Sequence, residues 1–238
     1  MDTLGFAVLT PAGPPDPALA IAAGRSGALG VLSLEFAPER ESALAALESL
    51  SHHARVPFAA LIDAADDELF TAVLAQSVSG LATVMLSAAG GAPDHARLER
   101  QIAQIHAGGR TAYVVATTLE AALAADSAGA DAIVAKGNEA AGWVGEETAF
   151  VLLQRLRRHV GRPVWVHGGV GRHTIAACRV AGAAGVMLDS QVLLLRESPL
   201  PAALKERIAA MDGSETADLG GAAGARFRAY ARPDLPAG

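Results

Sequence analysis

The chain has 238 residues, of which 51% are hydrophobic but only 4% aromatic, and its formal net charge is -6. This length is normal for one closed α/β barrel of about 250 residues, and a core of Ala, Val, Leu and Ile is typical of parallel strands covered by helices. The acidic balance argues against a nucleic-acid surface. Because the sequence has no stretch of about 20 apolar residues and no basic leader, we expect a cytoplasmic protein without a membrane span.

Eight short β-rich runs follow one another along the chain, with starts 20 to 32 residues apart. They begin at Leu4, Ala28, Val56, Leu81, Thr111, Asp131, Pro163 and Gly185. The segments between them, such as "DDELFTAVLAQSVSG" and "DHARLERQIAQIHAGG", carry apolar residues at spacings of three and four, which is typical of helices. Eight strand–helix repeats predict a single (β/α)8 TIM barrel of the α/β class, because a doubly wound sheet usually has fewer strands and a glycine motif after the first.

The character of the sequence changes at Asp212. Residues 212–238 have little periodicity and are rich in Gly, Ala and Pro, which is typical of a linker or a loosely packed tail. We therefore expect a barrel domain at residues 1–211 and a Gly/Pro-rich linker or tail at residues 212–238, with Phe227 and Tyr230 holding part of it against the barrel. The sequence is equally compatible with one module of a longer polypeptide.

In a barrel of this kind the active site lies in the loops that follow the C-terminal ends of the strands. Single polar residues there, such as Glu35, are expected to be strand ends or helix caps, and Asp63 and Thr118 are predicted to be helix N-caps. The loops after the seventh and eighth strands differ, because glycine amides and a helix N-terminus often form a phosphate site there. The residues predicted to hold such an anion are Gly168, Gly169, Asp189, Ser190 and Gln191.

Asp189 is an unusual member of this set, because a carboxylate repels a phosphate. Its side chain can point away from the anion, cap the short helix that follows, or bind a hydroxyl group of a cofactor. The sequence does not choose among these alternatives.

The loop after the sixth strand is the other candidate site. Lys136 ends that strand, and "GNEAAGWVGEE" precedes the next helix. A glycine-rich loop of this size at the functional end of the barrel is more than a connection requires, so we predict a ligand site there. The loop residues predicted to contact a substrate are Asn138, Glu139, Gly142 and Trp143.

Three blocks of the chain carry a family resemblance. They are "DPALAIAAGRSGALGVLS" at 16–33, "AGADAIVAKGNEAAGWVG" at 128–145 and "RPVWVHGGVGRHTIAACRVAGAAGVMLDSQ" at 162–191. In order and spacing they resemble blocks of the FMN-dependent nitronate monooxygenases, formerly called 2-nitropropane dioxygenases, and of the related flavin enoyl-ACP reductases. The segments "GNEAAGWVGEETAFVLLQRL" at 137–156 and "DSQVLLLRESPL" at 189–200 further resemble a variant of this fold found at the start of large polyketide- or fatty-acid-synthase-like polypeptides.

The resemblance implies that the cofactor is FMN. Its phosphate is then expected at Gly168, Gly169 and the amides near Ser190 and Gln191. Its isoalloxazine ring is expected against Leu9, Thr10, Pro11 and Lys136. A lysine at this place would put positive charge near the ring and stabilise the reduced, anionic flavin.

One residue departs from the family pattern. The family loop typically reads Glu-Ala-Gly-Gly-His, and its histidine is the acid/base group next to the substrate, whereas here Gly142 is followed by Trp143. Indole has no titratable nitrogen near neutral pH and cannot move a proton in that role. His167 titrates in a useful range and is one candidate substitute, or else a barrel-end histidine hydrogen-bonded to backbone or flavin. Lys136 is the other catalytic candidate.

Three functions remain open from the sequence. The first is an FMN-binding oxidoreductase domain that acts on a small-molecule or carrier-bound acyl substrate, with other domains of a polyketide or fatty-acid synthase as partners. The second is a catalytically inactive barrel kept as a structural or docking module of such a synthase. The third is a flavin-free, phosphate-binding aldolase or lyase that forms a Schiff base on Lys136. We expect no metal site and no nucleic-acid partner.

Overall fold

The computed structural model describes residues 4–90, 94–212, 215–220 and 226–230. Its central feature is a closed barrel of parallel strands in which the last strand pairs with the first. The barrel strands are β1 (Gly5–Leu9), β2 (Leu29–Ser33), β3 (Phe58–Asp63), β4 (Leu81–Ser87), β5 (Thr111–Ala116), β6 (Ala132–Lys136), β8 (Val164–His167) and β9 (Gly185–Leu188). Each predicted β-rich run contains one of these strands, so the predicted (β/α)8 barrel is confirmed.

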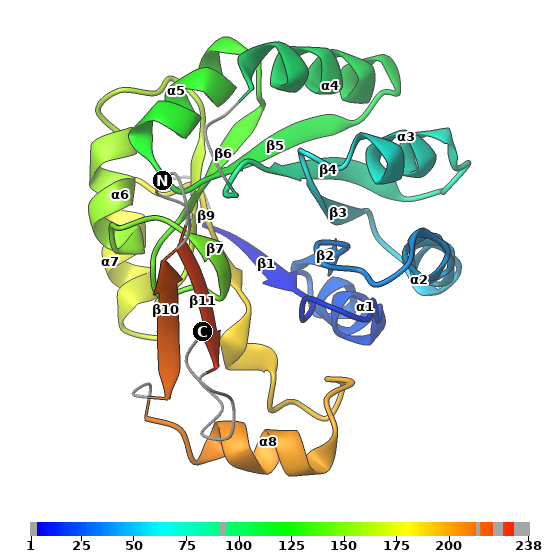
Figure 1. Cartoon of the computed structure of the whole chain (residues 1–238), viewed down its shortest axis with the longest axis vertical. Coiled ribbons are helices and arrows are strands. Elements are labelled where there is room, and N and C mark those ends of the chain that lie inside the picture. Colours follow the sequence, from blue (N-terminus) through cyan, green and yellow to red (C-terminus); the bar gives the residue numbers. More distant parts are fainter. Residues whose placement is uncertain (1–3, 91–93, 213–214, 221–225, 231–238) are drawn as a thin grey trace.

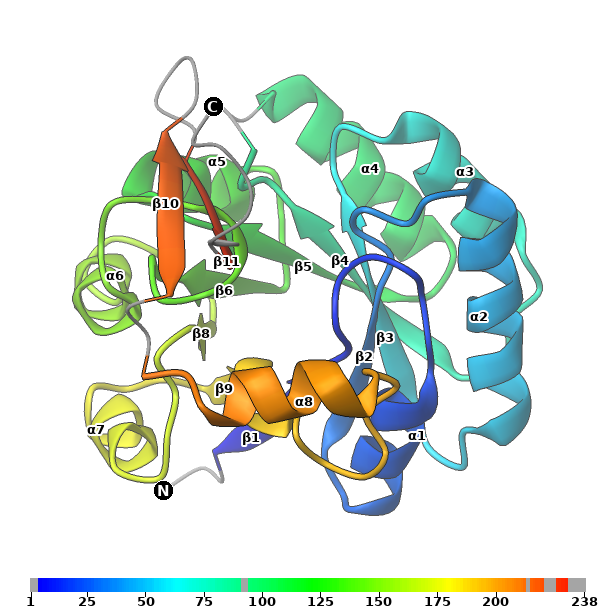
Figure 2. The same ribbon diagram turned by 60° about the horizontal axis from the view of Figure 1, so that its bottom comes forward.

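Helices surround the barrel on its outer face (Figures 1 and 2). They are α1 (Ala18–Arg25), α2 (Arg40–His53), α3 (Asp67–Ala75), α4 (His95–Ala107), α5 (Leu119–Ser127), α6 (Ala149–Leu156) and α7 (Thr174–Val180). A further helix, α8 (Ala202–Ala209), has no buried residue and lies apart from this ring, below the barrel in Figure 1. The predicted cap at Thr118 is confirmed, because its Oγ1 accepts a hydrogen bond from the Ala121 N–H over 3.1 Å. The predicted cap at Asp63 is wrong. Asp66 caps α3, while Asp63 accepts a hydrogen bond from the Ala65 N–H in the preceding turn.

The apolar core has two layers, as expected for this architecture. Side chains that point into the barrel form one cluster, which includes Leu61, Met85 and Met187. The larger cluster lies between the barrel and its helices. The Trp165 ring occupies the space that a Cβ on Gly5 or on Gly185 would need, so a bulky aromatic group fits where two strands carry no side chain. This packed interior leaves the barrel mouth, rather than its centre, as the place for a ligand.

A second, three-stranded antiparallel sheet lies beside the barrel (Figure 1). It consists of β7 (Gly142–Val144) from the loop after β6 and of β10 (Thr216–Gly220) and β11 (Arg226–Tyr230) from the C-terminal region. Part of the segment expected to be a linker or loose tail is therefore a hairpin. The division of the chain at residue 211 stays a prediction.

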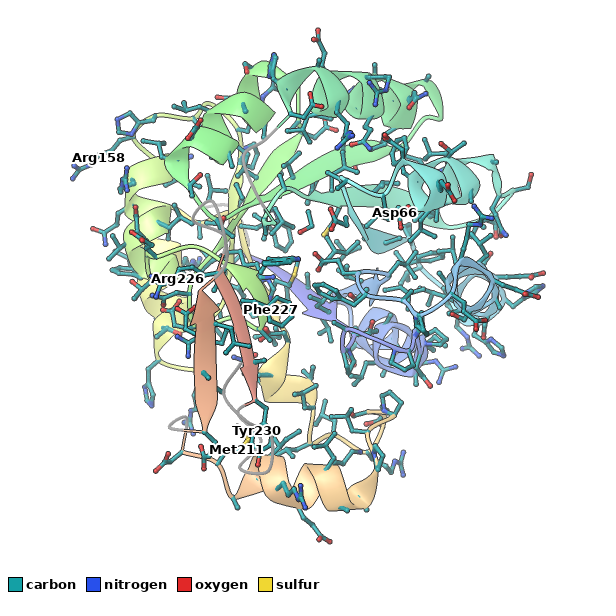
Figure 3. The ribbon with its side chains drawn as sticks, viewed as in Figure 1. Asp66, Arg158, Met211, Arg226, Phe227 and Tyr230 are labelled. Atoms are coloured by element: carbon teal, nitrogen blue, oxygen red, sulfur yellow. The ribbon has the colours of Figure 1, made fainter. Side chains whose placement is uncertain are left out.

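Phe227 holds this hairpin, as expected. In β11 it lies opposite Trp143 of β7, and its ring contacts the rings of Trp143 and Phe36 with centroids 5.1 and 5.6 Å apart. Figure 3 shows Phe227 on the part of β11 nearest the barrel, whereas Tyr230 lies toward the end near α8. Tyr230 is exposed. None of the helices in the described part of the chain is both long and apolar enough to cross a lipid bilayer.

Candidate functional site

A cavity of about 230 Å³ opens at the C-terminal ends of β1, β2, β6, β8 and β9. This is the end of a TIM barrel that carries active sites. Of the residues predicted from the sequence, the cavity is lined by Leu9, Thr10, Pro11, Lys136, Gly142, His167, Asp189 and Ser190. Lining residues that the prediction did not assign to the site are Ala12, Ser33, Glu35, Phe36, Ala141 and Leu193.

Lys136 is the buried cation of this cavity. It ends β6, lies opposite His167 in the β6–β8 ladder, and is only 3% exposed. Burial lowers the pKa of Lys136 below its ordinary value, while the negative charges of Glu35 and Asp189 act in the opposite direction. The amino group of Lys136 forms no ion pair with a carboxylate of the described residues, because none lies within 4 Å of it. The cavity therefore offers the buried amino group of Lys136, which has no ion-pair partner among the described residues, to an electron-rich or anionic ligand.

The buried His167 and the half-buried Asp189 form a pair at the same end of the barrel. Nε2 of His167 donates to Oδ2 of Asp189 over 2.9 Å, and Oγ of Ser190 donates to Oδ1 of Asp189 over 3.1 Å. Burial alone would raise the pKa of Asp189. The charge and hydrogen bond of His167, with hydrogen bonds from Ser190, outweigh this effect and lower the pKa to about 2. Asp189 is therefore ionised at neutral pH.

His167 has no ring nitrogen directed at a ligand in this arrangement. Nε2 is bonded to Asp189, and Nδ1 is buried without a hydrogen-bond partner among the described residues. General acid or base catalysis needs a nitrogen within hydrogen-bond reach of the reacting group. The geometry thus corresponds to the second alternative for His167, a barrel-end histidine in a hydrogen bond, with a carboxylate as the partner.

The glycine pair after β8 packs against the loop that follows β6. Gly168 and Gly169 have φ angles of +102° and +59°. A Cβ on Gly168 would lie 3.1 Å from the backbone nitrogen of Ala140, and one on Gly169 would lie 3.1 Å from Oε1 of Glu139. Neither glycine lines the cavity, and neither does Gln191. Backbone conformation and close packing therefore explain the pair without any ligand.

Two residues of the predicted substrate loop brace that loop instead of lining the cavity. Nδ2 of Asn138 donates to the Glu146 carbonyl over 2.8 Å. Oε2 of Glu139 accepts from the Ala149 N–H over 2.9 Å, at the first residue of α6. These contacts satisfy backbone groups that a loop and a helix end leave unpaired, so both side chains fix the path of the chain between β6 and α6.

Trp143 lines a second cavity, of about 320 Å³, together with residues at the ends of β3 and β4 that include Asp63 and Ser87. Phe36, which lines the first cavity, has a φ of +60°, an uncommon value for a residue with a side chain. The Phe227 ring contacts both Phe36 and Trp143. Among these three rings, here called the aromatic trio, Phe36 lines the first cavity, Trp143 lines the second, and Phe227 packs against both.

Glu35 and Phe227, which the prediction did not assign to the site, differ in how far their positions in the sequence point to a function. Glu35 follows β2 and lies at a strand end, where the rule for this barrel class places functional groups. A single carboxylate there did not stand out from the other strand ends. Phe227 carries no such signal, because it reaches the mouth only through the pairing of β11 with β7.

Several solved structures are similar to this chain in fold. FabK from Thermotoga maritima is similar over 97% of this chain and 72% of its own, with 26% sequence identity and a TM-score of 0.81. The nitroalkane oxidase from Streptomyces ansochromogenes is similar over 85% of this chain and 70% of its own, with 25% identity and a TM-score of 0.74. The enoyl reductase domain of MlnA, from the macrolactin biosynthesis cluster of Bacillus amyloliquefaciens, has the same fold, with 14% identity and a TM-score of 0.73 over 97% of this chain and 64% of its own.

Sequence comparisons point the same way. A Mycobacterium tuberculosis protein named for a monooxygenase activity, Rv1533, is 38% identical over 92 residues, which is 38% of this chain. The match spans only 24% of that protein's length. The family model described as "Nitronate monooxygenase" matches residues 70–230, which include β4 to β11. On this match, which covers more than half of the chain, the protein belongs to the nitronate monooxygenase family.

Proposed function

We propose that the chain is a flavin-binding oxidoreductase domain, with the isoalloxazine ring in the 230 Å³ cavity at the barrel mouth. The observation that carries this proposal is Lys136, which is 3% exposed yet lines a cavity with Leu9 and Pro11. A buried ammonium group beside apolar walls suits a flat ring system that gains negative charge on reduction. FMN is the flavin that the family resemblance implies.

The cavity suits the isoalloxazine ring of FMN better than it suits the phosphate. Drug-sized ligands usually occupy roughly 300–1,000 Å³, so a cavity of about 230 Å³ suits the ring, with the remainder of the flavin outside it. The remainder would extend toward the loops after β8 and β9. There the ionised carboxylate of Asp189 does not fit a phosphate.

A bound flavin would supply hydride or electron transfer. Lys136 would bind and orient the ring and stabilise the charge that develops on it. Leu9 and Pro11 would exclude water from one face. Trp143 cannot transfer a proton, and His167 directs no nitrogen at the cavity. Lys136 and Glu35 are then the lining residues that can hold a proton on the cavity side.

The substrate class predicted from the sequence, a small molecule or a carrier-bound acyl group, is kept as part of this proposal. The likeness to a synthase enoyl reductase domain is compatible with it at the level of the fold. Other domains of a synthase would then be the partners of this chain.

The test is a flavin titration of the purified chain, followed by quenching of flavin fluorescence, with FMN and with riboflavin. We expect at least one flavin to bind and Lys136→Met to weaken binding about tenfold, the scale of one lost charge interaction. Lys205→Met is the matched control, because Lys205 donates to the Leu195 and Ser198 carbonyls and does not line the cavity. A protein that binds neither flavin refutes the proposal.

A non-catalytic barrel is the second candidate, and the position of Trp143 favours it. The residue that stands in place of the family's histidine pairs with β11 and packs on Phe227. For this candidate flavin binding is not required. It predicts that neither NAD(P)H oxidation nor nitronate turnover exceeds the background rate. It also predicts measurable binding to a partner domain.

The lowered pKa of Lys136 is the one observation that favours a Schiff-base enzyme, since a desolvated amine is a better nucleophile. Borohydride reduction in the presence of aldehyde or ketone substrates tests this candidate. It predicts a covalent adduct on Lys136 in wild-type protein and none in Lys136→Met.

A further inference from the structure

Asp189 lies where the sequence predicts the cofactor phosphate. It directly follows β9, and its carboxylate is held by Nε2 of His167 at 2.9 Å and by Oγ of Ser190 at 3.1 Å. Its side chain is 17% exposed. Ser190 is itself a predicted phosphate ligand, and His167 directly precedes the glycine pair Gly168–Gly169. A carboxylate that is already paired with His167 therefore occupies this end of the cavity.

The cavity offers little positive charge to compensate a second anion there. Lys136 and His167 are the basic residues of its lining, and Nε2 of His167 already donates to Asp189. Lys136 faces the charges of both Glu35 and Asp189. A phosphate monoester carries a charge of about -1.5 to -2 at pH 7. Buried charges are poorly screened by salt, so a phosphate beside Asp189 would be repelled.

The conformation and packing of Gly168 and Gly169, which follow β8, are explained without a bound phosphate. Gly168 and Gly169 are required by their positive φ angles and by their contacts with Ala140 and Glu139. The pair is therefore explained by packing of the loop after β6, and it is not independent evidence for an anion site.

We propose that Asp189 is a specificity-determining residue that favours a flavin ending in a hydroxyl group, such as riboflavin, over one ending in a phosphate. An ionised carboxylate only accepts hydrogen bonds, so it suits a hydroxyl donor. A phosphate dianion also only accepts, and it shares the sign of the charge. This inference rests on the proposed flavin site and names the form of flavin that the site takes.

The experiment compares riboflavin with FMN on the full chain, by fluorescence quenching at pH 7 and fixed salt. We expect wild-type protein to bind riboflavin at least about tenfold more tightly than FMN, the scale of one like-charge contact. Asp189→Asn keeps the shape of the side chain and removes its charge. It is expected to tighten FMN binding about tenfold and to change riboflavin binding less than threefold, with circular dichroism confirming that the variant is folded.

Asp131→Asn is the matched control. Asp131 also accepts from a histidine, Nε2 of His106, over 2.9 Å, but it lies just before β6, at the opposite end of that strand from Lys136. This variant should leave the riboflavin-to-FMN ratio unchanged.

Two results would overturn the inference while leaving the flavin site intact. One is wild-type protein that binds FMN as tightly as riboflavin, and the other is a ratio that Asp189→Asn does not change. If the Asn variant does not fold, the wild-type ratio alone decides between the two outcomes. Failure of both flavins to bind refutes the proposed function instead, and the inference with it.

Discussion

Trp143 meets Phe227 edge to face, with ring centroids 5.1 Å apart and ring planes at 85°. One residue comes from the loop after β6, and the other from the C-terminal hairpin, where the two backbones also pair. The position at which the sequence resemblance implies an acid/base histidine is thus part of a sheet beside the barrel mouth. Its aromatic side chain serves packing in this chain.

Replacement of Phe227 by Ala tests this packing. The variant loses contacts to both other rings of the aromatic trio, each worth about 0.5–1.5 kcal/mol, so we expect the free energy of unfolding to fall by about 2 kcal/mol. Urea denaturation followed by tryptophan fluorescence measures it. Leu219→Ala is the control, because Leu219 pairs with Phe227 in the hairpin but is 54% exposed. Equal losses in the two variants would contradict a special role for Phe227.

The glycines after β8 provide a test of the packing explanation. Gly168→Ala places a Cβ 3.1 Å from the Ala140 nitrogen at a φ of +102°, and we expect a loss of about 2 kcal/mol of unfolding free energy. Gly171→Ala is the matched control, since a Cβ there meets no atom within 4 Å. Its stability should stay unchanged or rise by up to about 1 kcal/mol. A tolerated Gly168→Ala would show that the pair is not needed for packing.

Asp189 makes stability depend on pH in a defined direction. Its pKa falls from 3.8 to about 2 in the folded protein, so the ionised group stabilises the fold above about pH 4, and this contribution disappears as the pH falls toward 2. The difference corresponds to about 2 kcal/mol. We expect Asp189→Asn to be less stable than wild type by this amount at pH 7, and the gap to be about half as large at pH 3, which lies between the folded and unfolded pKa values. Urea unfolding at both pH values measures the gap, and a gap of constant size would contradict the assignment.

Glu139 is expected to act on stability rather than on ligand binding. Its carboxylate accepts from the first N–H of α6, so Glu139→Ala should cost about 1 kcal/mol, as for the loss of a helix cap. Flavin affinity should change less than twofold, because Glu139 does not line the cavity. Glu99→Ala, an exposed glutamate within α4, serves as the control and should cost less than about 0.5 kcal/mol. A large loss of flavin affinity without a loss of stability would restore Glu139 to the substrate loop.

The sequence by itself determined the barrel and the position of Lys136. Each strand and each helix has its own apolar pattern, which can be recognised in a short segment of sequence. The end of the apolar run of β6 also locates Lys136. The family resemblance rests on local blocks for the same reason, and the match over residues 70–230 confirms it.

Only the tertiary structure decided what the site residues contact. Asp189 could have pointed away, capped a helix or bound a cofactor. Its pairing with His167, 22 positions earlier in the chain, depends on the register of β8 against β9. The tail showed no periodicity, because strands of five residues are too short for a pattern to stand out, and β11 is defined by its pairing with β7. Contacts between distant segments follow from how the strands align, and local sequence patterns do not encode that alignment.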